Sequence, residues 1–285
     1  MKPSGVHFLL TYRCTQECDH CFVFGSPKAD ATFTSDRLTA VLDQCAAVRS
    51  VDWVFFEGGE PFLYYPVLWR GVLHASRAGF RVGLVTNAYW ATSAEDALRW
   101  LEGLGSVQLL HVSSDDLHHG GDAAALARVD HAVAAAERLD IAVSTLRVEP
   151  GDVCFRGRAA DKLTTGLARR PAATFDTCPH ETLDAPTRVH IDPLGFVQVC
   201  QGITIGNVFE TPLREIVHRY APASHPILGP LLRGGPCALA RALEVDTDAT
   251  GGGYVDACHL CFLARRQARS RGLAHLEPAI VYEGP

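Results

Sequence analysis

The sequence has no long hydrophobic stretch, because no run approaches the roughly 18 apolar residues that a membrane-spanning helix needs. Its N-terminal residues also lack the charged and then apolar layout of a secretory signal peptide. We therefore expect a cytoplasmic protein with no membrane partner. A hydrophobic content of 47% and a charged content of 20% are typical of a globular protein.

An excess of positive charge is also lacking. The formal net charge is −6, so the chain has no basic footprint of the kind that attracts nucleic acid, and we expect no nucleic-acid partner. At 285 residues the chain can form one large domain, or one domain with an appendage.

The ten cysteines are the main chemical feature of the sequence. In a chain expected to be cytoplasmic, they favour metal ligation over disulfides. Three of them, Cys14, Cys18 and Cys21, follow an apolar stretch (residues 6–11) that predicts a strand. Thiolates suit iron–sulfur clusters or zinc, but a closed structural site uses four protein ligands, and no fourth cysteine is near. A cubane cluster held by three thiolates keeps one iron open, whereas a redox or zinc loop is the alternative.

This spacing resembles the cluster loop of the radical S-adenosylmethionine (radical SAM) enzymes. The resemblance implies a [4Fe–4S] cluster whose open iron is chelated by S-adenosylmethionine (SAM). An electron from a reductant such as flavodoxin or ferredoxin would cleave SAM, and the resulting 5′-deoxyadenosyl radical would abstract hydrogen from a substrate.

A second motif supports the resemblance. A predicted strand (residues 51–56) is followed by Gly58-Gly59-Glu60-Pro61, where glycines let the backbone approach a ligand closely. This motif matches the family's segment for the SAM amino group, although an ordinary turn is the alternative. Gly157-Arg158-Ala159 resembles the family's Gly-Arg-Ala segment, which implies a turn at the adenosine side of the pocket; a simple helix start is the alternative. His20, Thr86, Asn87 and Ser113 are further candidates for cofactor binding.

The order of predicted elements indicates the fold. Further strands are expected at residues 81–85, 107–112 and 141–148, with helices between them, which is typical of a parallel sheet with right-handed crossovers. Only residues 149–152 separate the last strand from the apolar run 153–155, too few for a crossover helix. We therefore predict a partial (β/α) barrel of five to six mostly parallel strands, with its site at the strands' C-terminal ends.

The last third of the chain is again rich in cysteine. A hairpin is predicted at residues 188–199, and Cys258-His259-Leu260-Cys261 opens a basic helix. This arrangement resembles the SPASM domain of radical SAM maturases in its truncated Twitch form. The resemblance implies a small α+β domain over residues 168–285, after a barrel domain over residues 1–167. It also implies a second, auxiliary [4Fe–4S] cluster held by Cys178, Cys200, Cys258 and Cys261.

Other ligand assignments stay open for this region. A four-cysteine zinc site is chemically plausible for the same residues. Cys237 is a rival for any one ligand position, and we expect Cys154 to pack in the interior, with a substrate contact as the alternative.

A truncated barrel with one auxiliary cluster resembles the radical SAM dehydrogenases of aminocyclitol antibiotic biosynthesis. The resemblance implies oxidation of a small-molecule alcohol to a ketone, with the auxiliary cluster as acceptor of the second electron. One alternative is a maturase that modifies a peptide or protein side chain, and another is a non-catalytic iron–sulfur or zinc protein. Gln201 stands where sulfatase-maturing relatives have a carboxylate base, which argues against their chemistry.

The catalytic residues are predicted only from their places near strand ends. The candidates are Arg147, Arg158, Asp115 and His118. We expect the pair His118-His119 to belong to a substrate pocket or a solvated loop and not to a metal site, because adjacent side chains point in different directions and cannot easily bind one ion. We expect Glu57 to be structural.

Overall fold

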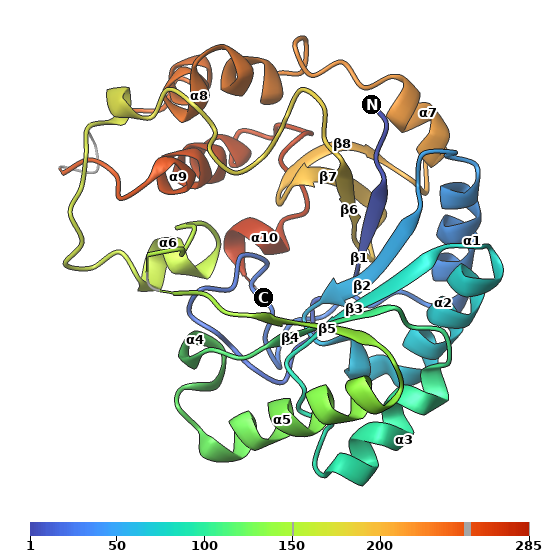
Figure 1. Cartoon of the computed structure of the whole chain (residues 1–285). Helices are drawn as coiled ribbons and strands as arrows, with labels where there is room; N and C mark the ends of the chain where they lie inside the picture. The colour runs from blue at the N-terminus through green and yellow to red at the C-terminus, as the bar shows by residue number, and fades with distance from the viewer. Residues whose placement is uncertain (150, 248–251, 285) are drawn as a thin grey trace.

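The computed structural model describes residues 1–149, 151–247 and 252–284. In these ranges eight strands form one sheet, in the order β5-β4-β3-β2-β1-β6-β7-β8. Figure 1 shows the sheet curving around the interior of the molecule. The strands are β1 (Gly5–Thr11), β2 (Trp53–Gly58), β3 (Arg81–Thr86), β4 (Leu109–Ser113), β5 (Ala142–Leu146), β6 (Arg188–Ile191), β7 (Phe196–Cys200) and β8 (Ile203–Asn207).

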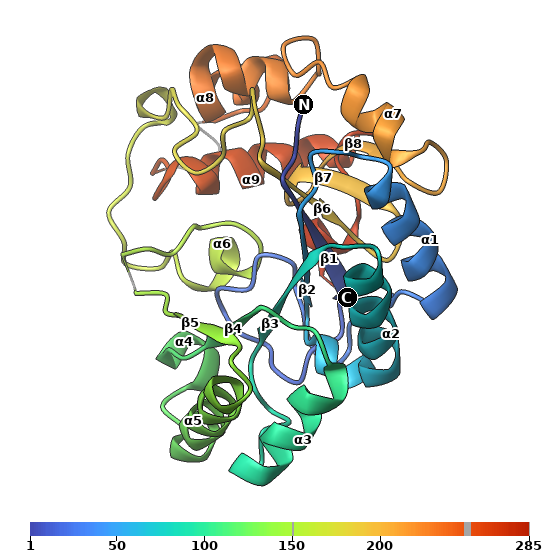
Figure 2. The ribbon, with the colours of Figure 1, turned by 45° about the vertical axis from the view of Figure 1, so that its right-hand side comes forward.

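Helices of the N-terminal half cover the convex side of the sheet, as Figures 1 and 2 show. They are α1 (Ser35–Ala46), α2 (Tyr65–Arg77), α3 (Ala94–Leu104) and α5 (Ala123–Arg138). The remaining helices are η1 (Pro61–Tyr64), α4 (Asp116–His119), α6 (Arg158–Lys162), η2 (Ala172–Thr174), α7 (Leu213–His218), α8 (Leu228–Ala242), α9 (Ala257–Arg269) and α10 (Ile280–Glu283). None of the helices in the described ranges has the length and apolarity needed to cross a bilayer.

Local sequence signals explain where the helices form. Buried residues of α1 follow the i, i+3, i+4, i+7 spacing of an amphipathic helix and include Cys45, which is 0% exposed and packs in the core. The α3 helix is capped by Ser93, whose side chain accepts a hydrogen bond from Asp96 N.

The strands alternate between two environments. Val6, Phe8 and Leu10 of β1 are 0% exposed on the side that packs under the helices, and His7 and Leu9 lie on the opposite, inner side. Because both sides of the central strands are covered, their sequences are almost continuously apolar. Polar residues on the inner side therefore stand out, and they mark the interior of the partial barrel.

The predicted partial barrel is confirmed, with one difference in how it is completed. The pairings from β5 through β1 are parallel, and the sixth parallel strand is β6, from the C-terminal hairpin. The apolar run 153–155 forms no strand. The C-terminal strands β6–β8 thus extend the barrel sheet beyond β1, and the division at residues 167/168 stays a prediction.

A buried carboxylate fixes the turn between β6 and β7. Asp192 Oδ1 accepts hydrogen bonds from Leu194 N and Phe196 N at 3.0 Å each, and Oδ2 accepts one from Tyr12 Oη at 2.9 Å. Burial raises the pKa of Asp192 to about 7, and these hydrogen bonds limit the rise. The hairpin is thereby joined to the residue that follows β1.

This carboxylate should make stability depend on pH. Because its pKa is higher in the folded than in the unfolded chain, its stabilising contribution is present below about pH 4 and is lost as pH rises through about 7. We expect the free energy of unfolding of the wild type, relative to Asp192→Asn, to fall by up to about 4 kcal/mol between pH 4 and pH 8. Urea unfolding of both proteins across this range measures it, and a constant difference would contradict the expectation.

Candidate functional site

The first group of cysteines lies in the mouth of the barrel. Cys14, Cys18 and Cys21 line one cavity with residues from the C-terminal ends of β2, β3 and β4. Gly25 N donates a hydrogen bond to Cys21 Sγ at 3.2 Å, and Asn87 Nδ2 lies 3.6 Å from Cys14 Sγ. The predicted ligands are thus brought together at the predicted end of the sheet.

The surroundings of these thiols suit a cationic centre. Burial raises the pKa of Cys14 and Cys18 to about 12, assisted by the charge of Glu60 at Cys14 and of Cys21 at Cys18. Thiolates in such a place form when a metal centre offsets their charge. The donor set therefore fits an iron–sulfur cluster with three protein ligands.

Arg158 holds the cysteine loop in place. Its Nη1 donates to Cys18 O at 2.6 Å, its Nη2 to Gly25 O at 2.9 Å, and its backbone N to Cys21 O at 2.9 Å. The side chain is 5% exposed, so it acts as a buried clamp on the loop. This geometry favours a positioning role over the predicted catalytic one.

The Gly-Gly pair lets β2 end directly against β1. Gly59 N donates to Thr11 O at 2.7 Å, and a Cβ on Gly59 would lie 2.1 Å from Arg13 O. Gly58 has a φ of +126° and would place a Cβ 2.5 Å from Thr11 O. Both glycines line the cavity, so their backbone is available to a ligand there.

Glu60 joins the ends of two strands. Its carboxylate accepts hydrogen bonds from Phe62 N at 3.1 Å, Thr86 Oγ1 at 2.9 Å and Asn87 N at 2.8 Å. Burial raises the pKa of Glu60 to about 7. Glu60 and the adjacent Pro61 are buried and lie outside the cavity lining, whereas Thr86 and Asn87 line it.

The loop after β4 adds a histidine to the cavity. Asp115 caps α4 and lies 2.9 Å from His118 Nδ1, and the other nitrogen, His118 Nε2, lies 3.2 Å from His20 Nε2. His119 points away from the cavity, with Nε2 2.7 Å from Ser113 O. Of this adjacent pair, only His118 lines the cavity, in agreement with its predicted place in a pocket.

Three further predicted residues have different positions. Ser113 lines the cavity. Gly157 packs on the cysteine loop, where a Cβ would lie 2.5 Å from Phe22 Cα, and it does not line the cavity. Arg147 is exposed and is not among the residues brought together.

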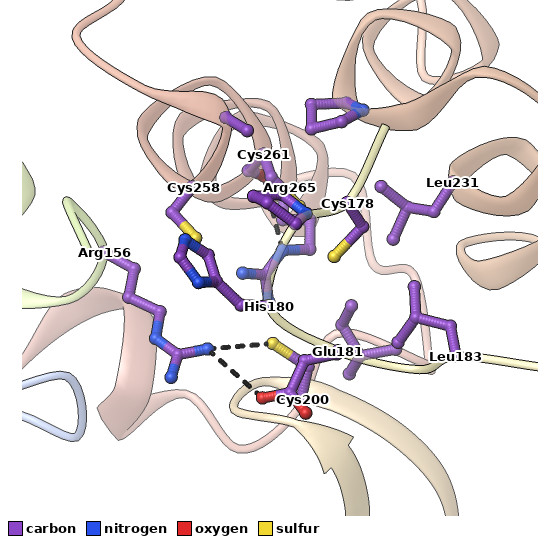
Figure 3. Close-up of a pocket in the computed structure, with 14 residues that line it drawn as sticks. Arg156, Cys178, His180, Glu181, Leu183, Cys200, Leu231, Cys258, Cys261 and Arg265 are labelled. Carbon is purple, nitrogen blue, oxygen red and sulfur yellow. Dashed lines mark hydrogen bonds and ion pairs between the residues drawn. The ribbon is translucent and has the colours of Figure 1, made fainter. Parts of the chain in front are cut away.

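The second group of cysteines shares another cavity. Figure 3 shows four thiol-bearing side chains directed toward one space from the loop before β6, the end of β7 and the start of α9. Asp256 fixes the start of α9, because Oδ1 accepts from His259 N at 2.6 Å and Oδ2 from Phe155 N at 3.2 Å. The four are the predicted ligands Cys178, Cys200, Cys258 and Cys261.

Two arginines, of which Arg265 is buried and Arg156 half-buried, face this cavity, and sequence reasoning missed both. Arg156 Nη1 donates to Cys200 Sγ at 3.2 Å and lies 4.0 Å from Glu181 Oε1 (Figure 3). Arg265 is 1% exposed and donates to Gln201 O at 2.7 Å, with no carboxylate within ion-pair distance in the part of the chain described. Their charges suit a negatively charged assembly of thiolates and metal.

The other two C-terminal candidates differ from the four. Cys237 is 8% exposed and is absent from the cavity lining, so the structure does not support it as an alternative ligand. Cys154, which we expected to pack in the interior, is instead half-buried. Its Sγ lies within 4.8 Å of Cys258 Sγ and of a His180 ring nitrogen.

The residues that sequence reasoning missed carried weak signals. Arg156 stands directly before Gly157 and Arg158, but nothing local shows which cysteine it reaches. His7 and His190 are polar residues inside apolar strands, and this break in the apolar pattern is the sequence signal that marks them.

The close approach at Gly59 generates a prediction. In Gly59→Ala, the new methyl group must displace Arg13 O and with it the start of the cysteine loop. We expect reconstituted Gly59→Ala to lose most of the iron held by the first cysteine group, measured as iron per chain. The matched control, Gly79→Ala, has a positive φ but no atom within 4 Å of the new Cβ, and it should retain its iron. Equal iron contents would contradict this reading.

Comparison with known proteins places this geometry in a family. Residues 8–142 match the Radical SAM superfamily. YydG of Bacillus subtilis (strain 168), named as a peptide biosynthesis protein, is 24% identical over 120 residues, covering 41% of this chain and 38% of that protein. The S-adenosylmethionine-dependent nucleotide dehydratase of Fibrobacter sp. (strain UWH6) is 24% identical over 93 residues, covering 30% and 28% respectively. The chain therefore matches well under half the length of either curated relative.

A solved structure supports the fold over a longer range. The crystal structure of BtrN in complex with AdoMet and 2-DOIA has a TM-score of 0.52 at 18% identity, covering 76% of this chain and 82% of that one. At this identity the similarity concerns the fold. The family match itself, over residues 8–142, identifies that part of the chain, with its cysteine loop and parallel strands, as a radical SAM domain.

Proposed function

We propose that this protein is a radical SAM dehydrogenase that oxidises a small-molecule alcohol with the help of two [4Fe–4S] clusters. Membership of the superfamily implies SAM and one [4Fe–4S] cluster. Cys14, Cys18 and Cys21 are the proposed ligands of that cluster, and the backbone of Gly58 and Gly59 is proposed to receive the SAM amino group. The observation that carries the rest is the second cavity, with its four thiols and two arginines.

An all-cysteine cluster in the second cavity would have no open iron and would suit electron transfer. Hydrogen abstraction from a carbinol carbon leaves a substrate radical, which becomes a ketone by losing one proton and one electron. The auxiliary cluster would accept that electron, and a reductant such as flavodoxin or ferredoxin would donate an electron to the first cluster. Among the described side chains, His118 in the first cavity is the proposed acceptor of the proton, oriented by Asp115.

Iron content tests the proposed ligands. Reconstituted wild type should hold about eight irons per chain, and a variant with Cys14, Cys18 and Cys21 all changed to Ala about four, as two cubane clusters require. That variant should form no 5′-deoxyadenosine from SAM. About four irons in the wild type together with one zinc that has sulfur neighbours at about 2.3 Å would instead indicate a structural zinc site at the second cysteine group, and the dehydrogenase would lose its electron acceptor.

Arg156 should set the reduction potential of the auxiliary cluster. An N–H···S hydrogen bond and a positive charge both stabilise the more negative, reduced cluster. We expect Arg156→Gln to keep its iron but to lower the potential, measured by redox titration followed by electron paramagnetic resonance (EPR). The matched control is Arg266→Gln, which removes a charge that pairs with Asp161 at the surface. An equal shift in both variants would contradict a specific role for Arg156.

Modification of a peptide is the second candidate function, favoured by the similarity to YydG. Substrate binding usually accelerates SAM cleavage above its uncoupled rate, so the two candidates can be separated with defined additives. We expect aminocyclitols and related polyols to increase 5′-deoxyadenosine formation and to yield a ketone. An increase with short synthetic peptides, and none with polyols, would favour the peptide reaction.

A further inference from the structure

Three titratable side chains share the inner face of adjacent strands, below the first cysteine group. His7 on β1 and His190 on β6 are paired residues in parallel strands, so they lie side by side on one face. Glu57 on β2 pairs with Leu9, which is two residues beyond His7 and therefore on the same face. The sheet register alone brings two imidazoles and one carboxylate together.

The three ligand atoms lie close enough together to bind a single ion. Glu57 Oε2 lies 3.1 Å from His7 Nδ1, and Glu57 Oε1 lies 3.4 Å from His190 Nε2. All three ligand atoms fall within 4.8 Å of one another. Zinc binds nitrogen and oxygen at about 2.0–2.2 Å, so the ligands of a tetrahedral site lie roughly 3.3–3.6 Å apart. Charge-assisted hydrogen bonds are usually shorter, at about 2.7–2.9 Å.

The polar atoms here are incompletely paired. Among the described residues, neither Glu57 Oε1 nor His190 Nδ1 has a hydrogen-bond partner, although both atoms are buried and His190 is 6% exposed. On the inner face, Phe55 stacks on His7 at 4.6 Å, and Gln198 of β7 is paired with His190. A buried carboxylate oxygen without a hydrogen bond is costly, and a cation shared by Glu57 Oε1 and His190 Nε2 would offset that cost.

We propose that His7, Glu57 and His190 form a binding site for one divalent transition-metal ion, separate from both groups of cysteines. Two imidazoles and a carboxylate favour zinc or iron(II) over magnesium or calcium, which prefer oxygen ligands. His7 and Glu57 line the same cavity as Cys14, Cys18 and Cys21, so the remaining coordination positions face the space where a substrate would react. The ion would bind a substrate oxygen there, a role that goes beyond the proposed function and does not require the auxiliary cluster.

Zinc binding to the full-length protein tests this site. After anaerobic reconstitution has filled the cysteine sites with iron–sulfur clusters, the protein is treated with a chelator, dialysed against zinc and analysed for zinc per chain. We expect about one zinc, with only nitrogen and oxygen neighbours at about 2.0–2.2 Å by X-ray absorption. Glu57→Gln, which is isosteric, and His190→Asn should each weaken zinc binding by more than the roughly 10–100-fold that changes outside the ligand shell cause.

The control is His111→Asn, which alters another inner-face histidine of the same cavity and should bind zinc as the wild type does. Iron content and circular dichroism establish that each variant is folded. If the strand substitutions prevent folding, the X-ray absorption spectrum of the zinc-loaded wild type tests the proposed ligands by itself. Absence of zinc uptake, sulfur neighbours at about 2.3 Å, or zinc binding unaffected by Glu57→Gln would overturn the proposal.

Discussion

The buried contacts of the segment from Cys154 to Arg158 are the constraint on which both cysteine groups depend. Arg158 binds two carbonyl groups of the first cysteine loop, and Arg156 reaches Cys200 in the second group while lying over the Phe22 ring at 5.2 Å. The first loop has little secondary structure of its own, so its shape must come from partners outside it. One short stretch of chain therefore positions the two groups relative to each other.

The continuous sheet also connects the two cysteine groups. Because β6 pairs directly with β1, the hairpin that ends in Cys200 is attached to the strand that leads into the first cysteine loop. Asp192 strengthens this joint through its hydrogen bond from Tyr12. A fixed separation between the two proposed clusters would suit electron transfer, since the path between them would run through packed structure and not along a flexible linker.

Much of the fold was predictable because its signals are local. Buried parallel strands are nearly all apolar, and Ser93 is a local capping signal, so most elements and the first cysteine loop followed from the sequence. The attachment of β6 to β1 was not predictable, because it joins residues more than 180 positions apart without any pattern linking them. The roles of Arg156, Arg158 and the His7–Glu57–His190 group depend in the same way on register and on tertiary contacts.

The most direct test of the two-centre arrangement is the EPR response of each reduced cluster to SAM. One variant lacks Cys14, Cys18 and Cys21, and the other lacks the four C-terminal cysteines, so each retains a single proposed cluster. We expect SAM to change the signal of the cluster held by the first group, which has an open iron, and to leave the signal of the closed auxiliary cluster unchanged. A SAM-dependent change in the auxiliary signal, or none in the first, would contradict the assignment of the two sites.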